Sequence, residues 1–315
     1  MGDRDGIMLV DKPSGMTSHD VVDFLRKSLK FRRVGHTGIL DPNATGLMLM
    51  LLGKGTKLSR FLTDLPKRYV ASFEFGVATD TYDAEGKIIS RADPGRMDRE
   101  DFEKLLQNFV GQIEQIVPVF SAAKRNGIAL YKLARKGDNV ASGTKVVNIE
   151  KIDILEFNWP EVELDIGCSS GTYVRSMAHQ MGEIIGCGGY LKSLRRLEVG
   201  RFNVSAASTL KEITEAKDVT RLIRPLKEAM PDQPRVRIKP NYYGAVLNGR
   251  PFMKKFVLES DYSGNGDTLS FLLGPDDNVL ALARLNMLWG AIDKLAPSEV
   301  IGTYVKVIDE GHIRN

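Results

Sequence analysis

The chain of 315 residues is poor in cysteine, histidine and tryptophan, with two, four and two of them. Cys168 and Cys187 do not form a Cys-x-x-Cys pair, and no histidine lies at metal-ligand spacing from either. These spacings argue against structural zinc and against a disulfide framework. The sequence GKGT at 53–56 does not have the spacing of a phosphate-binding loop. We therefore expect neither a metal nor a cofactor.

Long apolar runs are also missing. No segment approaches the roughly 20 apolar residues of a membrane-spanning helix. The N-terminal residues MGDRD lack the basic region and apolar core of a secretory signal. We therefore expect a cytoplasmic protein without a membrane partner.

The composition is that of a globular protein, with 43% hydrophobic and 27% charged residues. The length suffices for one large domain and a small one. The formal net charge is only +4, but lysine and arginine gather at 54–57, 124–125, 132–136 and 192–196. Such clusters suit a polyanion, although a single basic run is more often a solvated face.

One stretch stands out, GHTGILDPNATG at 35–46, followed by the apolar run Leu47–Leu52. Because Asp41 precedes a proline and lies among glycines, we expect its carboxylate on an extended loop that leads into a buried strand. A carboxylate in this position can act as a nucleophile. Aspartate, proline and glycine are also ordinary turn residues, so these residue types alone leave both interpretations open.

The pattern before and after this loop predicts alternating strands and helices. Residues 6–10 read as a buried strand, and Thr17 with Asp20 forms a capping-box pattern before an apolar helical stripe. Further predicted elements are a short basic helix at 56–62, strands at 67–77, 145–157 and 161–168, a helix at 102–110 capped by Asp98, and a helix opened by residues 170–172.

Tyr69 and Arg175 each have two interpretations. Tyr69 lies on the buried face of the predicted strand 67–77, where a core aromatic is the ordinary role. Arg175 lies in the first turn of a predicted helix, where a basic residue faces the unfavourable end of the helix dipole. An ordinary surface cation is common there, but this misfit favours a specific partner.

The C-terminal part has a different pattern. Short helices at 210–230 lead to the linker Pro231–Pro234, and strand-like segments follow at 270–273, 279–285 and 300–307. We therefore expect two domains, at 1–230 and 235–315.

Four blocks of the chain resemble the TruB family of tRNA pseudouridine synthases. They are the stretch at 35–46, DKPSGMTS at 11–18, the segment 118–135 with its Pro-x-x-Ser-Ala-x-Lys pattern, and GTYVR at 171–175. The resemblance implies an α+β pseudouridine synthase fold around a mostly antiparallel mixed sheet. NGRP at 248–251 resembles, weakly, the PUA-like RNA-binding domain at the C-terminus of the family; a plain small β-domain is the alternative.

The same resemblance implies roles for individual residues. Asp41 would be the catalytic aspartate, Arg175 would pair with it and keep it ionised, and Tyr69 would stack on the target base. The resemblance also implies substrate-binding residues. Lys12 would lie near the active site and help to anchor the neighbouring loop or the RNA, and His36 would help to displace the base. Leu194 would be the apolar wall of the base pocket with Arg195 and Arg196 nearby, Asp80 would have a supporting role, and Lys124 lies on the basic segment.

The implied reaction is the isomerisation of uridine 55 in the T-arm of tRNA, with base flipping and an aspartate-dependent break and re-formation of the glycosidic bond. The segment 118–135 resembles that of stand-alone, tRNA-modifying members rather than that of relatives directed by guide RNA. We therefore expect tRNA as the partner, no guide RNA, and a monomer.

Two other functions fit part of the pattern. A non-catalytic RNA-binding protein could use the same basic residues, and would tolerate the loss of Asp41. A carboxylate-based glycosidase would need a second acid at a defined distance from Asp41.

Overall fold

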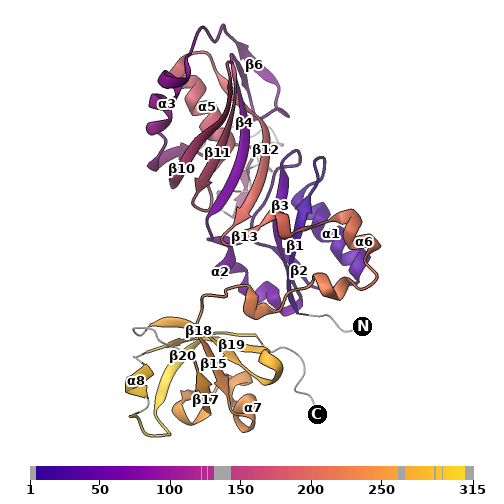
Figure 1. Ribbon diagram of the computed structural model, residues 1–315, viewed down its shortest axis with the longest axis vertical. Helices are drawn as coiled ribbons and strands as arrows, with labels where there is room; N and C mark the ends of the chain where they lie inside the picture. The colour runs from indigo at the N-terminus through magenta and orange to yellow at the C-terminus, as the bar shows by residue number, and fades with distance from the viewer. Residues whose placement is uncertain are drawn as a thin grey trace.

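The structure is a computed structural model that describes residues 5–121, 123–125, 127–130, 143–261, 267–286, 289–292 and 294–308. The predicted basic run 132–136 lies outside these ranges, as do the side chains of Lys124 and Arg125. Figure 1 shows a large part that holds the N-terminus and a smaller β-rich part that holds the C-terminus. Among the described residues, no helix combines the length and apolar character that crossing a bilayer requires.

The large part is built on one ten-stranded sheet. Its strands are β1 (Gly6–Lys12), β2 (Val34–His36), β3 (Thr45–Leu52), β4 (Lys67–Phe75), β7 (Gly111–Ile116), β10 (Thr144–Asn158), β11 (Glu161–Cys168), β12 (Gly189–Val199), β13 (Phe202–Asn203) and β14 (Ser208–Thr209). The order is β14-β1-β3-β12-β4-β11-β10-β7, with β2 paired to β3 and β13 to β12. Only the β1–β14 and β3–β12 pairs are parallel, so the expected mostly antiparallel mixed sheet is confirmed.

Short hairpins and helices complete this part. The hairpins are β5 (Val77–Thr79) with β6 (Ile88–Arg91), and β8 (Lys124–Arg125) with β9 (Ile128–Ala129). The helices are α1 (Ser18–Leu29), α2 (Ser59–Thr63), α3 (Arg99–Gln107), α5 (Val174–Ile185) and α6 (Leu210–Glu215), with 3₁₀ turns η1 (Gly53–Leu58), η2 (Val204–Ala206), η3 (Val219–Leu222) and η4 (Leu226–Glu228).

The helix ends follow local sequence where a capping side chain is present. The Thr17–Asp20 capping box precedes α1, and Asp98 caps α3 by accepting from Asp101 N. The predicted helix at 56–62 is instead split between η1 and α2. Helix α5 begins after Tyr173, later than the predicted opening at 170–172, and its N-cap makes no side-chain capping bond.

Strands β1 and β3 are apolar along nearly their whole length because both of their faces are covered. Met8, Val10, Met48 and Met50 belong to the core beneath α1. The intervening residues point to the opposite face and form a second core, whose members on these strands are Ile7, Leu9, Leu47, Leu49 and Leu51.

The C-terminal part is a six-stranded sheet with the order β16-β20-β19-β18-β15-β17. Its strands are β15 (Arg235–Ile238), β16 (Phe252–Met253), β17 (Val257–Ser260), β18 (Thr268–Leu273), β19 (Val279–Leu285) and β20 (Val300–Val307), and its helices are η5 (Pro240–Tyr242), α7 (Tyr243–Leu247), η6 (Lys254–Phe256), η7 (Pro275–Asp277) and α8 (Trp289–Ile292). The three strands predicted from the sequence are β18, β19 and β20. This part is β-rich, as expected.

The two parts share a core. Phe271 and Leu273 of β18 and Leu282 of β19 belong to the same buried cluster as the second face of β1 and β3. Polar contacts surround it: Lys57 Nζ donates to the carbonyls of residues 307 and 308, at 3.2 and 2.9 Å. The C-terminal part is therefore packed against the large sheet and is not joined to it by the linker alone.

A parallel contact between β3 and β12 joins the two halves of the large sheet. Only two residue pairs make it, Arg195 with Thr45 and Arg196 with Gly46. Gly46 has φ +103°, and a Cβ atom there would lie 2.3 Å from the Arg196 carbonyl oxygen. Glycine is required for this approach, and the approach brings the loop that precedes β3 to the middle of β12.

Candidate active site

The loop that carries Asp41 runs from the end of β2 to the start of β3 and is held on both sides. Ser18 Oγ accepts from Leu40 N at 2.8 Å and donates to the same residue's carbonyl at 3.0 Å. Lys12 Nζ donates to the Pro42 carbonyl at 2.9 Å. The residues before and after Asp41 are thus fixed by buried side chains, so the carboxylate has a defined position.

Lys12 anchors this loop, which is one of the two roles expected for it. Its fully buried ammonium group also donates to the carbonyls of Pro13 and Met16, at 2.9 and 2.6 Å. Burial lowers the pKa of Lys12 to about 8, and the nearby Asp41 carboxylate opposes this change. Three carbonyl acceptors match the three N–H groups of the protonated amine.

Arg196 holds the other side of the loop. Its side chain is 1% exposed, and its guanidinium donates to the carbonyls of Leu47, Ile39 and Gly38, at 2.6, 3.3 and 3.2 Å. Arg195, which the sequence analysis placed among the substrate-binding residues, points elsewhere and forms an ion pair with Asp11 at 2.7 Å. Alternate residues of a strand face opposite sides, so only one of two adjacent arginines can lie beside Leu194 on the loop side.

A cavity of about 510 Å³ opens at this loop. Asp41 and Arg175 lie in its wall together with the apolar groups of Tyr69, Leu191 and Leu194. The remaining lining residues come from the end of β2 and the same loop, from the end of α2, from β4, β10 and β12, from the segment before β8, and from the start of α5 with the segment before it. They are His36, Thr37, Gly38, Ile39, Leu40, Thr63, Asp64, Lys67, Ser121, Ala123, Lys145, Ser170, Gly171, Thr172, Tyr173, Val174 and Arg196. The cavity thus joins residues from almost the whole length of the large part.

Arg175 lies at the start of α5 and faces Asp41. Its Nη2 is 3.6 Å from Asp41 Oδ1, so the expected pair is present as an ion pair rather than as a hydrogen bond. Nη2 also donates to the Phe120 carbonyl at 2.9 Å, and Nη1 lies 3.2 Å from Asp83 Oδ2. The guanidinium is 6% exposed, so these partners determine its position.

The start of α5 is itself fixed by Gln115, a fully buried residue of β7. Its side-chain oxygen accepts from Tyr173 N at 2.9 Å, and its nitrogen donates to the Tyr173 carbonyl at 3.3 Å. Gln115 therefore satisfies the backbone N–H group of the N-cap residue, which the N3 glutamate or glutamine of a capping box would otherwise bind.

The pKa of Asp41 is raised above its ordinary value, and burial is the main cause. Arg175 lowers this pKa and Asp83 raises it, so the arginine opposes the shift but does not reverse it. The Asp41 side chain is 41% exposed, but that surface faces the cavity. The expectation that Arg175 decides the protonation of Asp41 was therefore incomplete, because desolvation outweighs the pair.

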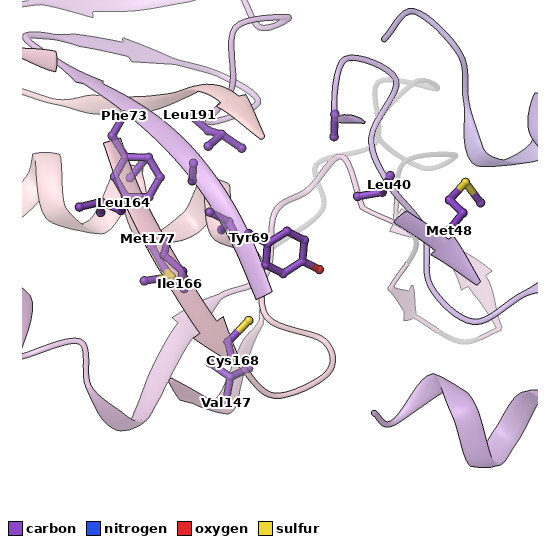
Figure 2. Close-up of a cluster of buried hydrophobic side chains, with 14 of the residues drawn as sticks. Leu40, Met48, Tyr69, Phe73, Val147, Leu164, Ile166, Cys168, Met177 and Leu191 are labelled. Atoms are coloured by element: carbon purple, nitrogen blue, oxygen red, sulfur yellow. The ribbon is translucent and has the colours of Figure 1, made fainter. Parts of the chain in front are cut away.

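Tyr69 is a core aromatic that also reaches the cavity, and its stacking on a base stays a prediction. It is 8% exposed and belongs to the core of the large sheet, yet it also lines the cavity. Figure 2 shows its ring near the start of β4, with the hydroxyl directed away from Phe73 and toward the side where Leu40 lies. Burial raises the pKa of Tyr69. Arg196, which lies opposite Tyr69 on the neighbouring strand β12, opposes this rise.

His36 lies in the cavity wall at the end of β2. Burial and the nearby Arg196 lower the pKa of His36, which favours a neutral imidazole. Its Nδ1 is buried and has no hydrogen-bond partner within the described part of the chain. Such a nitrogen can accept or donate a bond to a ligand.

The structure does not place Asp80 at the cavity. Asp80 is exposed, and its Oδ1 accepts from Lys87 N at 2.8 Å within the β5–β6 turn. The acid of this turn that contacts Arg175 is Asp83, whose Oδ1 accepts from Glu85 N at 3.1 Å. The sequence did not single out Asp83 as the aspartate of this turn that contacts Arg175. Gln115 was also missed, because a glutamine within a strand gives no local signal.

Among the described residues, no group of three or more His, Cys, Asp or Glu side chains is arranged to hold a metal ion. The cavity lining combines hydroxyl groups with charged or titratable side chains, which suit an organic substrate with a polar edge. The latter are Asp41, Asp64, Arg175, Arg196, Lys67, Lys145 and His36.

Comparison with known sequences relates the chain to one family. Residues 26–174 match the "TruB family pseudouridylate synthase (N terminal domain)", and residues 175–230 match the "tRNA pseudouridylate synthase B C-terminal domain". The tRNA pseudouridine synthase B of Syntrophotalea carbinolica is 40% identical over 280 residues, which cover 88% of this chain and 91% of the relative. That of Aquifex aeolicus is 38% identical over 262 residues, covering 82% and 90%.

Solved structures agree on the fold. The chain superimposes on one described as an H/ACA RNP bound to a substrate RNA containing 2'-deoxyuridine, with a TM-score of 0.73 and 22% identity over 96% of this chain and 85% of the other. A second, from a Cbf5-Nop10-Gar1 complex, gives 0.72 and 24%, with the same coverage. At these identities the likeness concerns the fold alone.

Proposed function

Because this chain belongs to the TruB family of tRNA pseudouridine synthases, we propose that it is an isomerase that converts uridine 55 in the T-loop of tRNA to pseudouridine. The observation that carries the proposal is the Asp41 carboxylate in the wall of a 510 Å³ cavity, paired with Arg175 and faced by Tyr69 and Leu194. The volume falls within the range of roughly 300–1,000 Å³ of small-molecule sites.

The base has to leave its stack before these groups can reach it. In the proposal the flipped uracil stacks on Tyr69, with Leu194 on the other side, and such stacking contributes roughly 1–3 kcal/mol. His36, in the same wall, assists in displacing the base from the folded loop.

The reaction breaks the bond between C1' and N1 and forms one between C1' and C5. The C5 proton leaves and N1 gains a proton, so the change is an isomerisation without an external reactant. Asp41 acts either as a nucleophile at the sugar or as a base that promotes glycal formation. Both routes require the ionised carboxylate, which Arg175 favours.

The remaining expectations form part of the same proposal. The T-arm of tRNA binds across the cavity, where Lys145 and the segment with Lys124 provide basic groups, without a guide RNA and to a single copy of the chain. The catalytic domain spans residues 1–230, and the β-rich domain at 235–315 adds RNA contacts. The family match does not support a glycosidase. Asp83, one acid near Asp41, is ion-paired with the arginine that also pairs with Asp41.

The test uses an unmodified tRNA transcript that carries tritium at uridine C5. Wild-type protein should release the label, because C5 loses its proton when it is joined to the sugar, and Asp41→Asn should release none while it still binds the tRNA. If both proteins bind the transcript and neither releases label, the chain is an RNA-binding protein and the proposal is wrong.

A further inference from the structure

Ser121 is a polar residue of the cavity that the proposed mechanism does not use. It belongs to the block at 118–135 and lines the same cavity as Asp41. The residue is 4% exposed, and its hydroxyl oxygen is buried without a hydrogen-bond partner in the described part of the chain. Buried hydroxyls in folded proteins nearly always have a partner, so a lone one in a cavity wall points to a ligand.

The segment that carries Ser121 is held firmly against the start of α5. Arg175 donates to the carbonyl of the preceding residue, Phe120, at 2.9 Å. Ser176 Oγ donates to the Ile116 carbonyl at 2.7 Å, and Gln115 binds both backbone groups of Tyr173. The hydroxyl of Ser121 is therefore connected, through one peptide unit, to the arginine that pairs with Asp41.

The other groups around Asp41 leave a role for this hydroxyl. Tyr69, Leu191 and Leu194 offer apolar surface to the faces of a base, while Arg175 is engaged by Asp41 and Asp83. A uracil has a polar edge with two carbonyl oxygens and an N–H group between them. That edge loses water on entering the cavity and needs protein partners there.

Resting on the function proposed above, we propose that the Ser121 hydroxyl donates a hydrogen bond to a carbonyl oxygen of the flipped uracil. In this proposal the detached base makes a half-turn about its N3–C6 axis, which exchanges N1 with C5. The same turn exchanges the C4 carbonyl with the C2 carbonyl. One fixed donor can therefore hold the base before and after the turn, since it meets a carbonyl oxygen in both orientations.

The test pairs a protein change with an atomic change in the substrate. Single-turnover rates are measured with a T-arm stem-loop whose target is uridine, 4-thiouridine or 2-thiouridine, because sulfur accepts hydrogen bonds more weakly than oxygen. We expect Ser121→Ala to slow the uridine reaction roughly ten- to hundredfold. At least one thio substitution should slow the wild type by a similar factor and have little further effect on Ser121→Ala.

Ser193→Ala provides the matched control, because Ser193 lies on β12 between cavity-lining residues but is exposed and bonds to Ser72. It should show the same thio effects as the wild type. The inference is overturned if both thio substitutions slow Ser121→Ala as much as they slow the wild type. Ser121→Cys, which keeps the volume with a weaker donor, answers the same question if the alanine variant does not fold. Failure of the wild type to convert the uridine stem-loop would instead overturn the proposed function.

Discussion

At the scale of single residues, the site depends on how two carboxylates share one arginine. Asp41 and Asp83 both contact Arg175, at 3.6 and 3.2 Å. Burial and Asp83 raise the pKa of Asp41, whereas Arg175 lowers it. A carboxylate with a raised pKa is more basic once it is ionised, but it is protonated at a higher pH than an ordinary aspartate.

The first prediction concerns this pH dependence. The single-turnover rate should fall as the pH decreases through the raised pKa of Asp41, because the protonated acid can act neither as nucleophile nor as base. Asp83→Asn removes a negative charge and leaves Arg175 to Asp41 alone, and both effects lower that pKa. The acidic limb of the pH–rate profile should therefore move to lower pH, with a plateau reduced roughly tenfold or more because Arg175 is less well positioned.

Asp80→Asn serves as the control for this prediction. It makes the same chemical change on the same turn, but its carboxylate binds Lys87 N rather than Arg175. The acidic limb should stay where it is in the wild type. A limb that moves equally in both variants would mean that overall charge, and not the Arg175 contact, sets the pKa of Asp41.

The aspartate of the site could be predicted from the sequence, and some of its neighbours could not. Asp41 and Arg175 could be assigned because the blocks that carry them, 35–46 and 171–175, resemble family motifs, whereas the residue types alone left both interpretations open. Choosing Asp83 over Asp80 requires the path of the β5–β6 turn, which depends on its contacts with β12: Leu191 N donates to the Tyr82 carbonyl at 2.9 Å. The place of Arg196 on the loop side could also have been predicted, because Arg196 lies two residues after Leu194 and therefore on the same face of the strand.

At the scale of elements, the contact between β3 and β12 positions the Asp41 loop. Gly46 makes that contact with a left-handed φ of +103° and with no room for a Cβ atom. Arg196, its partner, holds the loop by its side chain as well. A change at Gly46 should therefore disturb both the stability of the sheet and the reaction.

The second prediction is that Gly46→Ala lowers the free energy of unfolding by about 3 kcal/mol or more. The methyl group would displace the Arg196 backbone, so the loop should shift and the rate should fall roughly a hundredfold or more. Gly95→Ala is the matched control, since Gly95 also has a positive φ, +61°, but nothing within 4 Å of an added Cβ. It should cost about 1–2 kcal/mol and leave the rate unchanged, as urea unfolding and single-turnover assays can check. Equal effects at the two glycines would contradict the argument.

Most elements were predicted because their signals are local. The capping box of α1, the Asp98 cap of α3 and the alternation in β4 each lie within about ten residues. Helix α5 is an exception at its start, because Gln115, some sixty positions earlier, supplies the partner for Tyr173 N. A capping partner so far away in the chain leaves no pattern that sequence analysis can use.

At the scale of the whole molecule, the arrangement of the two domains explains an apolar pattern whose cause the sequence alone does not show. Strands β1 and β3 are apolar on both faces because α1 covers one and the C-terminal β-domain covers the other. The two domains could be predicted from the linker and the change of pattern. Their packing could not, because it joins Ile7 and Leu9 to residues more than 260 positions later.

This shared core predicts that the domains unfold together. Phe256 lies in the far core of the C-terminal domain and is 3% exposed, so Phe256→Ala should cost about 3–5 kcal/mol there. Trp159 stacks on Phe75 in the catalytic domain, at 5.1 Å between ring centroids. In a Trp289→Phe variant it is the single tryptophan of the chain, so its fluorescence reports on this domain. If the domains form one cooperative unit, the Tm followed by Trp159 fluorescence should fall by at least about 5 °C in Phe256→Ala. A Tm for Trp159 that does not change, while calorimetry shows a separate earlier transition, would mean that the shared core is too weak to couple them.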